Sequence, residues 1–114
     1  MALPPNNPEE LLYLARLAEQ CDRFDEMVEY IVAFAKKSSV ELTTDERNIL
    51  SVAFKNVVGT RRAAWRVISL IERKENKKGA AANVQKAKTY KLIIEKELTD
   101  ICKQILDLLN DHLL

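Results

Sequence analysis

Apolar residues recur three and four positions apart along most of the chain, and polar stretches divide this pattern into four segments. Such spacing places apolar side chains on one face of an α-helix. The first two segments, over residues 7–21 and 22–35, are short, whereas those over 46–74 and from about 80 onward are long. The pattern therefore predicts an all-α fold, an antiparallel array of two short and two long helices.

Residues that favour helix starts support these boundaries. Asn7, which is followed by a proline and two glutamates, is expected to cap the first helix. Asp22 is expected to cap the second helix. Thr43 and Glu46 have the spacing of a capping box, in which each side chain bonds the backbone of the other, and this predicts the start of the third helix.

Polar stretches should separate the helices. Residues 36–42 are expected to form a loop, and residues 73–79, which end in a glycine, should contain a break. The last helix carries an apolar seam whose spacing suits packing against neighbouring helices over a long distance. Its final part has no partner within the chain, so we expect it to pack on further chain or on a second copy. The seam consists of Ala87, Tyr90, Ile94, Leu98, Ile101, Ile105 and Leu108.

Composition supports a helical domain and excludes several functions. The chain has 114 residues, which suits one domain over residues 1–114, and only two glycines and three prolines interrupt it. A net charge of +1 argues against non-specific nucleic-acid binding. No apolar run reaches the roughly 18 residues of a membrane span, so no membrane insertion is expected. The chain starts without a secretory signal, so we expect a cytoplasmic protein.

The sequence offers no catalytic or metal chemistry. His112 is the only histidine and has no cysteine or histidine at ligand spacing. No nucleophile–base pair and no glycine-rich phosphate loop can be proposed. We therefore expect neither an enzyme nor a bound metal or cofactor. Cys21 and Cys102 lie on apolar helical patterns, which predicts reduced and mostly buried thiols.

The third segment carries cations on a narrow stripe. At about 100° per residue, Lys55, Arg62 and Arg66 fall within about 40° of one another on the helix. No acidic residue lies between Glu46 and Glu72 to pair with them. Clustered arginines are the usual device for binding phosphorylated residues. A solvated basic face is the alternative, and spacing alone favours it.

The single tryptophan, Trp65, lies beside this stripe, about 80° from its centre. A lone tryptophan at helical spacing most often belongs to a core. Stacking on a ligand is the alternative.

Three motifs resemble one known family. Residues 46–66, with the sequence ERNILSVAFKNVVGTRRAAWR, closely resemble the third-helix signature of 14-3-3 proteins. Residues 17–27 are similar to the turn after the family's first helix, and residues 95–102 to part of its fourth helix. The resemblance covers nearly the whole chain but only about the first four of the family's nine helices, so the C-terminal helices are expected to be absent here.

The resemblance implies an adaptor that binds phosphoserine or phosphothreonine segments of client proteins. Lys55, Arg62 and Arg66 match the cations of the family's phosphate pocket. The family completes this pocket with an arginine and a tyrosine on a later helix. We therefore expect half a pocket here, and weak or no phosphopeptide binding by these residues alone.

The resemblance also implies a homodimer, or a heterodimer with a related chain. In the family, the first helix of one subunit packs on the third and fourth helices of the other. Arg23 and Glu97 match an intersubunit salt bridge of the family. A helical dimerisation module without phosphopeptide binding is the alternative function, and a small nucleic-acid-binding bundle is a weaker one. The apolar positions that match the family's interface are Leu17, Cys21, Ala64, Ile68 and Tyr90.

Overall fold

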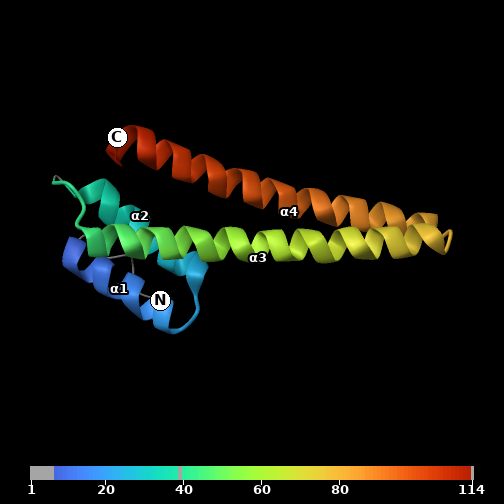
Figure 1. Cartoon of the computed structure of the whole chain (residues 1–114), viewed down its shortest axis with the longest axis horizontal. Helices are drawn as coiled ribbons and strands as arrows, with labels where there is room; N and C mark the ends of the chain where they lie inside the picture. The colour runs from blue at the N-terminus through green and yellow to red at the C-terminus, as the bar shows by residue number, and fades with distance from the viewer. Residues whose placement is uncertain (1–6, 39, 114) are drawn as a thin grey trace. The chain divides into compact units, whose positions relative to one another are not determined.

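A computed structural model describes residues 7–38 and 40–113 of the chain. Within these residues all regular structure is helical, which confirms the predicted all-α fold of two short and two long helices (Figure 1). No helix among them is both long and apolar enough to cross a membrane. The helices are α1 (Pro8–Gln20), α2 (Phe24–Lys37), α3 (Thr44–Lys77) and α4 (Ala81–Leu108), followed by a π-helical turn, η1 (Leu109–Leu113).

The chain divides into two compact units. The first unit comprises Met1–Val57 and Gln104–Leu114, and the second comprises Val58–Lys103. Helices α3 and α4 each contribute residues to both units.

The first unit holds most of the buried apolar side chains. Helices α1 and α2 pack against each other, and Leu11, Met27 and Ile31 are its largest fully buried residues. Burying a side chain of this size contributes about 1.5–3 kcal/mol. Ala15, which is also fully buried, lets the backbones approach closely. The rest of this core consists of Ala18, Val28, Val32, Phe34, Ala35, Leu42, Ile49, Leu50, Ala53, Phe54, Val57 and Leu108.

Two of the three predicted helix caps are present. The Asn7 side chain accepts a hydrogen bond from the Glu9 backbone N–H at 2.9 Å. The capping box of α3 forms both of its bonds: Thr43 Oγ1 accepts from the Glu46 N–H at 3.1 Å, and a Glu46 carboxylate oxygen accepts from the Thr43 N–H at 2.9 Å. Each cap satisfies backbone donors that the first turn of a helix leaves free.

The prediction that Asp22 caps α2 is wrong. The N-cap residue is Arg23, which makes no side-chain capping bond. Asp22 has a φ of 55° and ends α1 instead. Its N–H donates to the Glu19 carbonyl at 3.1 Å, and the Arg23 N–H donates to the Ala18 carbonyl at 2.8 Å. These two bonds form a Schellman motif, and its left-handed residue cannot also serve as an extended N-cap.

A second Schellman motif reverses the chain between the two long helices. Helix α3 continues to Lys77, so the predicted break is confined to Lys78, Gly79 and Ala80. Gly79 has a φ of 74° and donates to the Asn76 carbonyl, while the Ala80 N–H donates to the Glu75 carbonyl. A glycine adopts this left-handed conformation without the steric cost that a Cβ atom adds. The loop before α3 is also shorter than predicted, since α2 runs to Lys37.

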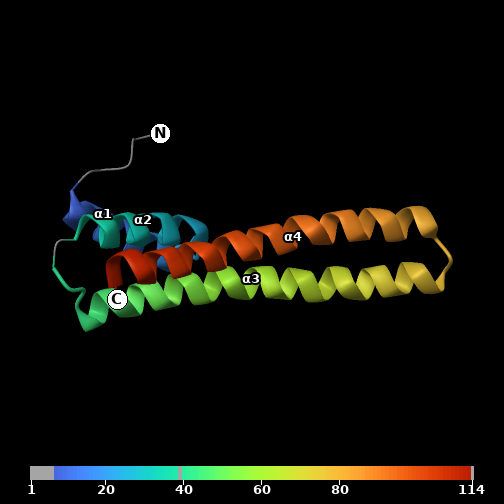
Figure 2. The ribbon, with the colours of Figure 1, turned by 90° about the horizontal axis from the view of Figure 1, so that it is seen from above.

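The second unit is an antiparallel hairpin of α3 and α4 (Figures 1 and 2). Among its described residues, Ala87 and Ile94 are the only buried apolar side chains. The predicted seam is therefore incomplete, and Tyr90 is 58% exposed. Both thiols are exposed as well, so the prediction that Cys21 and Cys102 are mostly buried is wrong. Helical spacing marks a face of a helix, but a neighbour must cover that face before its residues are buried.

The left-handed conformation of Gly79 predicts that an alanine there is destabilising. We expect Gly79→Ala to lower the free energy of unfolding by about 1 kcal/mol, because a Cβ atom disfavours positive φ. Gly59 provides a matched control, since it lies within α3 and an added Cβ would meet no atom within 4 Å. Gly59→Ala should raise the same free energy by about 0.5–1 kcal/mol. Urea denaturation measures both, and effects of the same sign would contradict this account.

Candidate functional site

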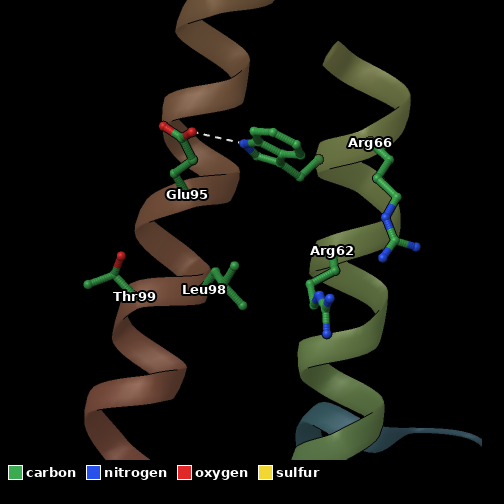
Figure 3. A pocket seen from close by; sticks show the side chains of 6 residues that line it. Arg62, Arg66, Glu95, Leu98 and Thr99 are labelled. Atoms are coloured by element: carbon green, nitrogen blue, oxygen red, sulfur yellow. Dashed lines mark hydrogen bonds between the residues drawn. The ribbon is translucent and has the colours of Figure 1, made fainter. Parts of the chain in front are cut away.

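The predicted basic residues all lie on α3, and two of them line a groove. Arg62 and Arg66 belong to the second unit, where both are exposed. Figure 3 shows them on one helix of the hairpin, across from Glu95 on the other. Lys55 belongs to the first unit and is exposed there. The groove has a volume of about 600 Å³ and is lined by Arg62, Trp65, Arg66, Glu95, Leu98 and Thr99.

The two walls of the groove differ in chemistry. The α3 wall presents two guanidinium groups, each with five N–H donors. The α4 wall presents the Leu98 side chain, a hydroxyl from Thr99 and a carboxylate from Glu95 (Figure 3). The groove can therefore bind an anion on one side and contact an apolar or hydrogen-bonding group on the other.

No carboxylate of the described residues neutralises Arg62 or Arg66. Within residues 7–38 and 40–113, neither guanidinium forms an ion pair. Their neighbour Arg61 differs, since its Nε lies 3.1 Å from Oε1 of Glu97 on α4. Like charges four residues apart on a helix repel each other. An anion bound between Arg62 and Arg66 would relieve this repulsion.

Trp65 forms part of the groove wall. Its Nε1 donates a hydrogen bond to Oε2 of Glu95 at 2.8 Å, the dashed line in Figure 3. The Nζ of Lys91 lies 4.5 Å from the centroid of the indole ring, within the range of a cation–π interaction. Trp65 is 37% exposed, so it does not occupy the buried core position that its spacing predicts. It connects the two helices at the edge of the groove.

Lys91 also pairs with a carboxylate on α3. Its Nζ lies 3.6 Å from Oε1 of Glu72, and both side chains are 23% exposed. This Glu72 oxygen accepts no hydrogen bond within the described part of the chain. Its contact with Lys91 is therefore an ion pair that is not also a hydrogen bond. Glu72, Lys91, Trp65 and Glu95 thus form a continuous chain of contacts between the helices.

The predicted interface residues of the first unit lie on its surface. Leu17 is 37% exposed, and Cys21 is exposed at the end of α1. Arg23 forms an ion pair with Glu26. The hydrogen bond to Glu26, together with its charge, raises the pKa of Arg23 above its ordinary value.

The predicted interface residues of the second unit are also accessible. Ala64 and Tyr90 are exposed, and Ile68 is half-buried. Glu97 pairs with Arg61. Each partner of the predicted bridge between Arg23 and Glu97 therefore forms an ion pair within its own unit.

Sequence reasoning missed the α4 side of the groove. Residues at similar distances from the Gly79 turn lie near each other in an antiparallel hairpin, as Arg61 does to Glu97 and Trp65 to Glu95. The same rule would have brought Glu95 and Thr99 to the basic residues of α3. Neither residue stands out by periodicity, because each lies on the polar side of the helix.

Over its described residues the chain is thus a helical protein whose groove carries two arginines without an ion pair, facing a wall of apolar and polar side chains. Comparison with known proteins then identifies the family. The family model described as "14-3-3 protein" matches residues 14–114. The chain belongs to the 14-3-3 family, as its third-helix motif predicts.

Curated relatives agree with this assignment. The chain is 55% identical over 105 residues to 14-3-3 protein 7 of Solanum lycopersicum, a match that covers 92% of this chain and 41% of that protein. It is 54% identical over 106 residues to 14-3-3 protein epsilon of Drosophila melanogaster, covering 93% of this chain and 40% of the relative. The chain thus spans about two fifths of the length of the relatives it matches.

The contacts of Trp65 predict a local contribution to stability. We expect Trp65→Phe to lower the free energy of unfolding by about 1–2 kcal/mol, because phenylalanine cannot donate to the charged Glu95 acceptor. Tyr13→Phe is the control, since Tyr13 is 62% exposed and makes no hydrogen bond within the described residues. It should change stability by less than about 0.5 kcal/mol. Thermal unfolding followed by circular dichroism compares them, and equal effects would contradict a role for the Glu95 bond.

Proposed function

We propose that this chain supplies the α3 cations of the phosphate-binding pocket of a 14-3-3-type adaptor. The observation that carries the proposal is that Arg62 and Arg66 line one groove and form no ion pair within the described residues. The ligand is a phosphoserine or phosphothreonine segment of a client protein. Family membership supports an adaptor role rather than a catalytic one.

The chemistry of the groove suits a phosphate ester. A phosphorylated side chain carries a charge of about −1.5 to −2 and three strong acceptor oxygens. A guanidinium binds such a group through two parallel N–H···O bonds. Lys55, which belongs to the first unit, remains a predicted third phosphate-binding cation on the same helix. Leu98 and Thr99 offer apolar and hydrogen-bonding contacts to the client chain beside the phosphate.

On this proposal, the described groove supplies only part of the phosphate pocket of a complete adaptor. The relatives are more than twice as long as the matched region. We assign the remaining groups of the phosphate pocket to the family's later helices. The 114 residues alone should therefore bind a phosphopeptide weakly, with a Kd of about 1 mM, which corresponds to about −4 kcal/mol.

A titration with paired peptides tests phosphate recognition. We expect a phosphoserine peptide to shift the amide resonances around Arg62 and Arg66, because the phosphate replaces water at these guanidinium groups. Its unphosphorylated twin should leave these resonances unchanged. Arg62→Glu should abolish the shifts, since it sets like charge against the phosphate. NMR spectra of the 15N-labelled chain report the binding site even at millimolar affinity.

Arg73→Glu is the matched control for this titration. Arg73 lies on α3, is exposed and does not line the groove. The reversal has the same effect on net charge as Arg62→Glu, but it should weaken binding less than threefold at moderate salt, because screening limits distant charges. If both peptides bind equally, or if both reversals have the same effect, the phosphate site is refuted.

We also propose a dimerisation surface, as a second function of the same chain. The supporting observation is that apolar residues at the predicted interface positions are exposed, with Leu17 at 37% and Tyr90 at 58%. The partner is a second copy or a related chain, and Ala64 and Ile68 contribute to the contact. On this proposal Arg23 and Glu97 pair across the interface, after releasing Glu26 and Arg61 respectively. Exposed ion pairs contribute only about 0–1 kcal/mol, so this exchange is nearly neutral.

A charge at Leu17 tests the dimerisation surface. We expect Leu17→Glu to weaken self-association about 100-fold, because a carboxylate without a partner would be buried in the contact. Leu106→Glu is the control, since Leu106 is 59% exposed and lies outside the proposed surface. Sedimentation equilibrium measures both dissociation constants. A wild-type chain that is monomeric at tens of micromolar would refute the proposal outright.

A further inference from the structure

The groove carries a negative charge that phosphate binding does not require. Glu95 stands on the α4 wall, across from Arg62 and Arg66 (Figure 3). We propose that Glu95 is a specificity-determining residue, which lets the groove accept an isolated phosphate group and reject segments that carry several adjacent phosphates. This inference rests on the proposed binding of phosphate by Arg62 and Arg66.

The Glu95 carboxylate is held in place by its neighbours. Its Oε2 accepts the Trp65 Nε1–H at 2.8 Å. The indole ring is in turn covered by Lys91 at 4.5 Å from its centroid, and Lys91 is anchored by Glu72 at 3.6 Å. These contacts keep the carboxylate on the α4 wall. Within the part of the chain that the structure describes, Glu95 forms no ion pair with either groove arginine.

A fixed carboxylate affects one phosphate and several phosphates differently. Two guanidinium groups offer a charge of about +2, which one phosphate of charge about −1.5 to −2 nearly neutralises. A second phosphate in the same groove of about 600 Å³ finds no further cation among the lining residues and approaches Glu95. Repulsion between two like unit charges about 8 Å apart corresponds to a roughly sixfold to thirtyfold loss of affinity at effective dielectric constants of about 40 to 20.

The other acidic residues of the hairpin do not share this position. Asp100 pairs with Lys96 at 3.0 Å on the exposed side of α4, with 63% of its side chain accessible. It does not line the groove. Asp100→Asn therefore alters the net charge by the same amount as Glu95→Gln while leaving the groove unchanged.

The test compares the binding of two peptides of equal length to the 114-residue chain. One carries a single phosphoserine, and the other carries three consecutive phosphoserines. NMR titration gives the ratio of their dissociation constants for the wild type, Glu95→Gln and Asp100→Asn. The glutamine carbonyl can still accept the Trp65 N–H, so Glu95→Gln removes the charge and keeps the bond. A peptide with three phosphates has a statistical advantage over one with a single phosphate in every variant. Comparing the ratio of dissociation constants between variants cancels this advantage.

We expect Glu95→Gln to tighten binding of the singly phosphorylated peptide about threefold and binding of the triply phosphorylated peptide at least tenfold. Asp100→Asn should leave the ratio unchanged. Thr99→Glu provides an independent variant, because it adds a carboxylate to the groove wall without altering the Trp65 bond. Thr99→Glu should weaken binding of the triply phosphorylated peptide more than binding of the singly phosphorylated one. It therefore tests the inference by itself if Glu95→Gln does not fold. The fluorescence of Trp65, the only tryptophan, reports whether the groove is intact in each variant.

The outcomes separate this inference from the proposal beneath it. If the wild type binds the single phosphoserine and Glu95→Gln leaves the ratio unchanged, the specificity role is wrong and phosphate binding stands. If Asp100→Asn changes the ratio as much as Glu95→Gln, net charge rather than the groove explains the preference, and the role is again refuted. If neither peptide binds the wild type or Glu95→Gln, phosphate binding and the specificity role both fail.

Discussion

The chain reversal at Lys78–Ala80 is the constraint on which the second unit depends. The left-handed Gly79 closes α3 through a Schellman motif and starts α4 in the opposite direction within three residues. This short turn determines the register of the hairpin, so residues at similar distances from it lie near each other. The pairs Arg61–Glu97 and Trp65–Glu95 follow from that register.

Polar contacts connect the two helices of the hairpin along its edges. Few apolar side chains are buried in it, whereas ion pairs and hydrogen bonds connect the helices at several levels. Exposed pairs of this kind are individually weak, and the Lys91 contacts to Trp65 and Glu72 gain from partial burial. A surface held in this way keeps charged groups accessible. It therefore suits a groove whose ligand is an anion better than a continuous apolar core would.

Periodicity and turn chemistry predicted the helices well because both act locally. The four helices, the Asn7 cap, the capping box of α3 and the break near Gly79 depend on residues a few positions apart. Asp22 was misassigned because two local roles competed for one residue, and ending α1 excluded capping α2. The two cysteines were predicted to be mostly buried and Tyr90 to lie on a packing seam, but all three side chains are exposed among the described residues.

The amino-acid sequence by itself determined the all-α class, the helix boundaries to within a few residues, the family and the cations of the basic stripe. All of these are properties of a continuous segment, which periodicity and motif similarity can detect. Only the tertiary structure showed that, among the described residues, Arg61 forms an ion pair while Arg62 and Arg66 do not, and that Glu95, held by Trp65, lines the same groove. The physical reason is that charge compensation depends on distance in space, and residues some 30 positions apart become neighbours only when the hairpin closes.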